Sequence, residues 1–111
     1  MFRDDRQTAR VCRALLEGVR LGRLWTDAGP TEEALELLKA GGGPLSSGEA
    51  LMIRVAFDLW NGHGGTSLAR LLEVLDPERL EALGSLLVAL ARGAAAVDAW
   101  LMERAKGSGA S

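Results

Sequence analysis

The sequence predicts an all-α fold, a single-domain bundle of five helices around a buried central helix over residues 47–61, with six helices as the alternative. Leu and Ala dominate the composition, Tyr is absent, and Ile occurs only at Ile53. Leu and Ala favour helices, whereas β-branched and aromatic residues favour strands. A chain of 111 residues corresponds to one domain. We place this domain at residues 1–106 and expect residues 107–111 to form a flexible tail.

The central helix has the clearest signals. Ser46 and Glu49 match the S-x-x-E capping box that begins helices, and Gly62 is a typical stop. The residues from 51 to 60 are apolar except for Arg54 and Asp58, which are four apart and can pair. A helix that is apolar on nearly every side is buried among other helices. It is too short to cross a bilayer, which takes about 20 residues.

Two helices are predicted before it. The first extends from about Asp4 to Leu24. The second extends from Pro30 to Ala40, because proline suits the first position of a helix and the glycines that follow Ala40 end it.

Two helices are predicted after it. Thr66 or Ser67 caps a short helix that ends near Leu75, and we expect four leucines to form its buried stripe: Leu68, Leu71, Leu72 and Leu75. Asp76 and Pro77 then begin the last helix.

Apolar residues of the last helix alternate steps of three and four straight through Gly93. We therefore predict one continuous helix to about Arg104, which could supply a dimer seam. A break at Gly93, giving a sixth helix, is the alternative.

The sequence predicts no catalytic, cofactor-binding or metal-binding residues. His63 is the only histidine and Cys12 the only cysteine, too few for a zinc site and no basis for a nucleophile triad. The glycine-rich loop over residues 61–67 presents backbone N–H groups that could hold an anion. It does not match the P-loop pattern, so we interpret it as a turn, with ligand binding as the alternative.

Cysteine usage and the N-terminus indicate a cytoplasmic protein. A secreted small domain would normally carry an even set of cysteines. The first ten residues lack the apolar core of a signal peptide, and no apolar run is long enough for a membrane span. The preference for Arg over Lys, with abundant Ala and Gly, suggests a GC-rich bacterial source.

Basic residues form a stripe on the first predicted helix. They are spaced by three and four, with Glu17 filling the one gap, and comprise Arg3, Arg6, Arg10, Arg13 and Arg20. The simpler interpretation is a solvated face with Arg13–Glu17 and Glu17–Arg20 surface pairs. The functional alternative is a docking face, because Arg binds carboxylates and phosphates through paired hydrogen bonds. Trp25 and Trp100 are expected in the core or, alternatively, in a partner-binding patch.

These features favour a small non-enzymatic module or adaptor that binds another protein or a second copy of itself. The alternative is a DNA-binding transcriptional regulator that uses the basic N-terminal helix. Nucleic acid is disfavoured because residues 24–111 carry an excess of acidic side chains and the Arg stripe has no interleaved aromatics. A helix–turn–helix reading at Asp76-Pro77 would place Glu78 and Glu81 against phosphates, which is unfavourable.

Overall fold

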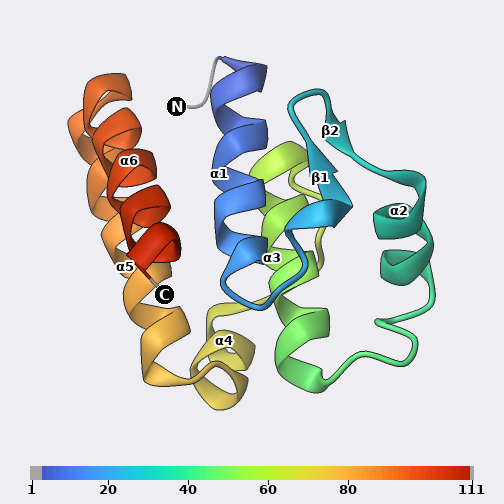
Figure 1. Cartoon of the computed structure of the whole chain (residues 1–111). Coiled ribbons are helices and arrows are strands. Elements are labelled where there is room, and N and C mark those ends of the chain that lie inside the picture. The colour runs from blue at the N-terminus through green and yellow to red at the C-terminus, as the bar shows by residue number, and fades with distance from the viewer. Residues whose placement is uncertain (1–3, 111) are drawn as a thin grey trace.

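The computed structural model describes residues 4–110 of the chain and the side chains of residues 4–106. The described residues form a compact bundle of six α-helices with one short hairpin (Figure 1). The predicted all-α fold is confirmed, in its six-helix form. The elements in chain order are α1 (Asp5–Glu17), η1 (Gly22–Leu24), β1 (Trp25–Thr26), β2 (Gly29–Pro30), α2 (Glu32–Lys39), α3 (Ser47–Asn61), α4 (Leu68–Val74), α5 (Pro77–Arg92) and α6 (Ala94–Ala110).

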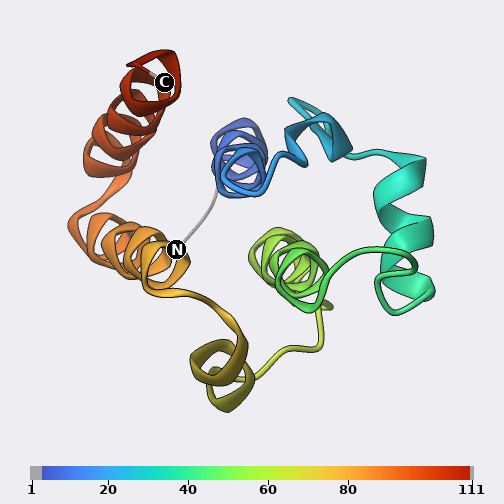
Figure 2. The same ribbon diagram turned by 60° about the horizontal axis from the view of Figure 1, so that its bottom comes forward.

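Helices α1 and α3 lie side by side in the middle of the bundle (Figure 2). Helix α2 and the hairpin cover one side of this pair, the α5–α6 pair covers the other, and α4 closes one end. The predicted burial of the central helix is confirmed, because Met52, Ile53 and Phe57 are almost fully shielded from solvent. The predicted capping box is also present, with Ser46 and Glu49 each accepting a hydrogen bond from the other's amide. None of the helices in the described part of the chain is long and apolar enough to cross a membrane.

Helix α1 ends at Glu17, so the prediction that it continues to Leu24 is wrong. The chain leaves the helix through Arg20, whose φ of 64° is left-handed. The amide of Leu21 donates to the carbonyl of Leu16 at 2.8 Å, and the amide of Arg20 donates to that of Glu17 at 3.0 Å. These two bonds form a Schellman motif, which ends helices. Glycine is the usual left-handed residue of this motif, so an arginine there gave no stop signal in the sequence.

A β-hairpin that the sequence did not predict follows η1. Trp25 pairs with Pro30, and Thr26 pairs with Gly29. Gly29 has a φ of 122°, and a Cβ there would lie 2.7 Å from the ring of Trp60. Glycine is therefore required at the hairpin for both its backbone freedom and its lack of a side chain.

The hairpin also moves the start of α2. Pro30 belongs to β2 and is not the first residue of a helix, so that prediction is wrong. Thr31 caps α2 instead, its hydroxyl accepting a hydrogen bond from the amide of Ala34 at 3.2 Å.

Only half of the predicted stripe of α4 is buried. Leu71 and Leu75 face the bundle, whereas Leu68 and Leu72 are 75% and 70% exposed. The prediction is wrong for these two leucines because α4 spans only seven residues and meets the bundle along a narrow edge, mainly at α3.

Gly93 separates α5 from α6, so the preferred prediction of one continuous helix is wrong and the alternative break is confirmed. Its φ of 112° and ψ of −179° lie in a region that is essentially restricted to glycine. The chain reverses there, and α6 returns alongside α5 (Figure 1). Leu83 and Val97, two members of the continuous apolar register, are buried within the same chain. A dimer seam along a single long helix therefore loses its basis. Helix α6 extends through residue 110, Ser111 lies outside the described residues, and a flexible tail over 107–111 stays a prediction.

Candidate functional site

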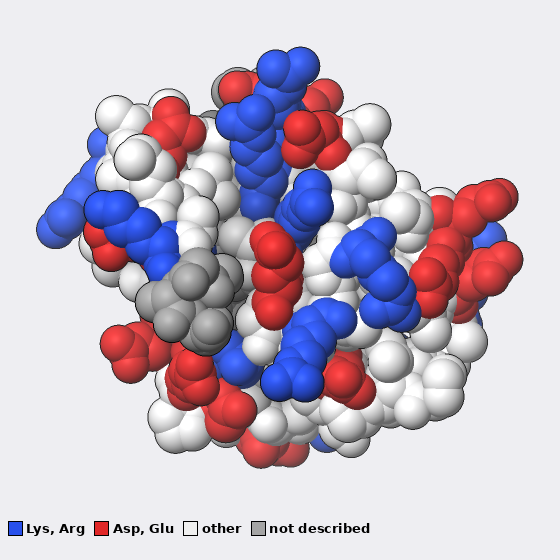
Figure 3. All heavy atoms as spheres, viewed as in Figure 1, with Lys and Arg blue, Asp and Glu red and all other residues white. Residues whose placement is uncertain are grey.

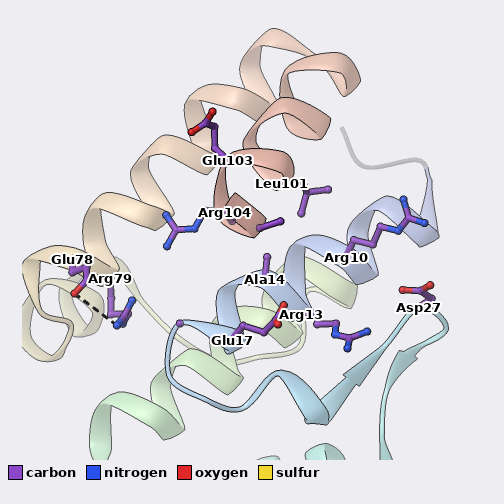
Figure 4. A pocket seen from close by; sticks show the side chains of 12 residues that line it. Arg10, Arg13, Ala14, Glu17, Asp27, Glu78, Arg79, Leu101, Glu103 and Arg104 are labelled. Atoms are coloured by element: carbon purple, nitrogen blue, oxygen red, sulfur yellow. Dashed lines mark ion pairs between the residues drawn. The ribbon is translucent and has the colours of Figure 1, made fainter. Parts of the chain in front are cut away.

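A surface groove with a volume of about 960 Å³ lies beside α1. Four segments that are distant in sequence meet there: the outer face of α1, the hairpin turn, the start of α5 and the last described turns of α6 (Figure 4). Its charged lining residues are four arginines, Arg10, Arg13, Arg79 and Arg104, and four acids, Glu17, Asp27, Glu78 and Glu103. Because the signs balance, the groove presents a mixed surface and no field of one sign.

Few of these charges pair with one another. Among the described side chains, only Arg79 and Glu78 form an ion pair within the groove, with 3.8 Å between Nη2 and Oε2. The expected Arg13–Glu17 and Glu17–Arg20 pairs are absent from the ion pairs of the described residues. The space-filling view shows basic and acidic side chains interspersed over the face that carries α1 (Figure 3). The groove thus holds positive and negative groups that a partner could pair with.

Arg79 is held in place by the end of α1. Its side chain is only 18% exposed. A Cβ on Gly18, the residue after α1, would lie 2.9 Å from Nη1 of Arg79. The guanidinium therefore lies at the C-terminal end of α1, where the helix dipole favours a positive charge. Glycine at position 18 leaves the space for this contact.

Arg104 is positioned by an aromatic side chain. Its guanidinium carbon lies 5.5 Å from the centre of the Trp100 ring, a cation–π arrangement. Trp100 is 8% exposed, and its Nε1 donates a hydrogen bond to Oγ of Ser85 on α5 at 2.9 Å. Of the two expectations for Trp100, the structure shows the core position. Trp100 contributes to the groove only by holding Arg104.

Trp25 also takes the core alternative of its prediction. It is 1% exposed, and its ring packs edge to face against Phe57 and Trp60, with centroid distances of 4.9 and 6.1 Å. A ring enclosed in this way offers no surface to a partner. It anchors the hairpin, which in turn places Asp27 at the rim of the groove.

The Arg stripe is divided by the structure. Arg10 and Arg13 line the groove, whereas Arg6 is exposed on the same helix outside it. Arg20 is exposed but lies beyond the end of α1, so it does not continue the helical face. Arg3 lies outside the described residues. That any of these arginines binds a partner stays a prediction.

Sequence reasoning missed Arg79, Arg104 and the acidic members of the groove other than Glu17. They come from elements whose mutual placement no local pattern specifies. The one available signal was the four-residue spacing of Trp100 and Arg104, which puts the two side chains on one helix face.

The glycine-rich loop is occupied by a side chain of the protein itself. The carboxylate of Asp58 accepts hydrogen bonds from the amides of Gly64, Gly65 and Thr66 at 2.8, 3.3 and 3.4 Å. Asp58 and Arg54 do not form the expected pair in the described structure, because each is directed to this loop. These loop amides therefore already bind an internal anion, the Asp58 carboxylate, which takes the place that an external anion would occupy.

The two reactive residue types lie apart. Cys12 is buried, its Sγ donates to the carbonyl of Ala56 at 3.3 Å, and burial raises its pKa from 9.0 to about 12. The thiol is therefore protonated and poorly nucleophilic at neutral pH. His63 is exposed in the loop after α3. Within residues 4–106, no group of three or more His, Cys, Asp or Glu side chains could hold a metal ion.

Comparison of the chain with family models, with curated proteins and with solved structures finds no match in any of the three.

Proposed function

We propose that this chain is a non-enzymatic interaction module of the bacterial cytoplasm that binds a protein partner in the groove beside α1. The observation that carries this proposal is the set of charges in the groove: four arginines and four carboxylates, of which one pair is joined within the described structure. Charges arranged in this way select a partner by complementarity. The partner segment would therefore carry both acidic and basic side chains.

The composition of the groove disfavours the alternative of DNA binding. A nucleic acid presents a uniform row of negative phosphates, and contacts with Lys and Arg dominate its affinity. A phosphate backbone laid along Arg10 and Arg13 would also meet Glu17 and Asp27, which line the same groove. Like charges brought together at an interface lower affinity.

The test is affinity capture from a nuclease-treated native lysate with tagged wild-type protein and two charge-reversed variants. Arg13→Glu changes the groove, and Arg6→Glu is its matched control, because it lies on the same helix and is exposed outside the groove. We expect one protein to be enriched with wild type and with Arg6→Glu, and to bind Arg13→Glu about tenfold more weakly, a change of roughly 1.4 kcal/mol. Equal loss in both variants, or binding of duplex DNA that falls steeply with salt, would contradict the proposal.

Self-association is a second form of the same function. Sedimentation velocity at micromolar concentration tests it, and a species that stays monomeric would leave a different protein as the partner.

A further inference from the structure

A second groove, of about 500 Å³, differs from the first in its charge. It lies between the connection from α2 to α3, the first two turns of α3, and the chain that leads from Gly65 into α4. Its polar lining consists of two guanidinium groups, Arg54 and Arg70, and three hydroxyls, Ser47, Thr66 and Ser67. No Asp or Glu of the described residues lines it. This groove is therefore positive, although the chain as a whole is negative.

Arg54 carries a positive charge that the described side chains do not neutralise. It is half-buried, and its one hydrogen bond to the described residues is a long one of 3.4 Å from Nη1 to the carbonyl of Gly64. A guanidinium has five N–H donors, and Arg54 forms no ion pair with a described carboxylate. Asp58, the acid nearest to it along α3, is engaged by loop amides. The Arg54 guanidinium therefore keeps N–H donors that an anion in the groove could engage.

Two further groups in the same groove lack strong partners. The hydroxyl oxygen of Thr66 is buried and forms no hydrogen bond within the described structure. Buried hydroxyls are normally bonded. Arg70 is largely exposed, and its only ion-pair partner among the described residues is Glu73 at 4.0 Å. An exposed pair at this distance contributes little, so Arg70 can turn to a ligand at small cost.

We propose that this groove binds the phosphate group of a small organic phosphate monoester. Two guanidiniums and the exposed hydroxyls of Ser47 and Ser67 supply more donors than the two oxygens of a carboxylate can use, whereas a phosphate has three terminal oxygens that accept strong charge-assisted hydrogen bonds. The volume lies within the range of small-molecule sites, roughly 300–1,000 Å³, and exceeds what a bare ion fills. The ester's organic group would occupy the remaining space against Leu45 and Leu51.

Titrations followed by phosphorus NMR and calorimetry test this site, at constant ionic strength in a phosphate-free buffer. The probes are glycerol phosphate, inorganic phosphate and acetate. We expect saturable binding of both phosphates and at least roughly tenfold weaker binding of acetate. Tighter binding of glycerol phosphate than of inorganic phosphate would assign the organic ester as ligand. Equal binding would assign the free ion, which overturns the ester assignment and keeps the phosphate site.

Variants locate the binding. Arg70→Gln, at an exposed position where folding is safe, should weaken phosphate binding about tenfold, and Arg54→Gln should abolish it. Arg92→Gln is the matched control, because it removes an exposed arginine that does not line this groove. The absence of saturation with either phosphate, acetate binding as tight as phosphate, or equal losses in Arg70→Gln and Arg92→Gln would each overturn the proposal.

Discussion

Replacing Gly93 by alanine should destabilise the protein, although the new methyl group would touch nothing. A Cβ at this position has open space within 4 Å, so the effect comes from the backbone alone. Holding an alanine at a φ of 112° and a ψ of −179° costs about 1–3 kcal/mol. Alanine also lowers the conformational entropy of the unfolded chain relative to glycine, which offsets about 0.4–1 kcal/mol of this strain. The free energy of unfolding should therefore fall by about 1–2 kcal/mol, measured by urea denaturation with circular dichroism.

Gly84→Ala is the matched control for this prediction. Gly84 lies inside α5, also with open space around it, but at a helical φ. The same substitution there should raise the free energy of unfolding by about 0.5–1 kcal/mol. A second readout is light scattering, because joining α5 to α6 would open the pair and favour an exchanged dimer. If Gly93→Ala is as stable as wild type or more stable, the strained turn is refuted as the cause of the helix break.

Three further predictions concern the loop, the core and the end of α1. Asp58→Ala leaves three loop amides without their acceptor and should lower the free energy of unfolding by about 2 kcal/mol in urea denaturation. Cys12 keeps its proton in the folded state up to about pH 12 and loses it in the unfolded state above pH 9. Its contribution to stability is therefore complete below pH 9 and is lost as the pH rises from 9 to 12, by up to about 1.4 kcal/mol per unit, measured against Cys12→Ala. Arg20→Gly relieves the left-handed strain at the end of α1 and should raise the melting temperature, at a gain of about 1 kcal/mol.

Each of these predictions has an outcome that contradicts it. Stability of Asp58→Ala within 0.5 kcal/mol of wild type, roughly the scatter of surface substitutions, would remove the loop anchor. The Cys12 prediction fails if the thiol of the folded protein reacts with Ellman's reagent at pH 8 as fast as the unfolded chain does. A lower melting temperature for Arg20→Gly would show that the Schellman turn is not strained.

The sequence was sufficient for the parts of the fold that depend on local chemistry. The capping box at Ser46 and Glu49, the stop at Gly62 and the Asp76-Pro77 start all occur as predicted. Each depends on contacts within a few residues, which a sequence displays directly.

Predictions from the sequence were wrong where a local pattern is compatible with two different structures. The apolar spacing through Gly93 is compatible with one long helix and with two helices that fold back on each other, and only the tertiary packing selects the second. Arg20 ends α1 in a position where glycine is expected, because the buried Leu16 and Leu21 hold the turn from either side.

The candidate groove was only half visible for the same reason. Arg10 and Arg13 could be read from the spacing of a single helix. Arg79 and Arg104 come from α5 and α6, far along the chain from α1, and no local charge pattern shows that these helices line the same groove as α1.

Site-directed photo-cross-linking tests the proposed binding groove most directly. The buried Cys12 thiol, with its raised pKa, allows a single introduced cysteine to be labelled with a benzophenone maleimide. Ala105→Cys places the label at the groove, and Ala91→Cys places it at an exposed helical position away from it. We predict that the captured partner cross-links to position 105 and not to position 91. Cross-linking to position 91 alone, or equally to both, would contradict the assignment of this groove as the docking site.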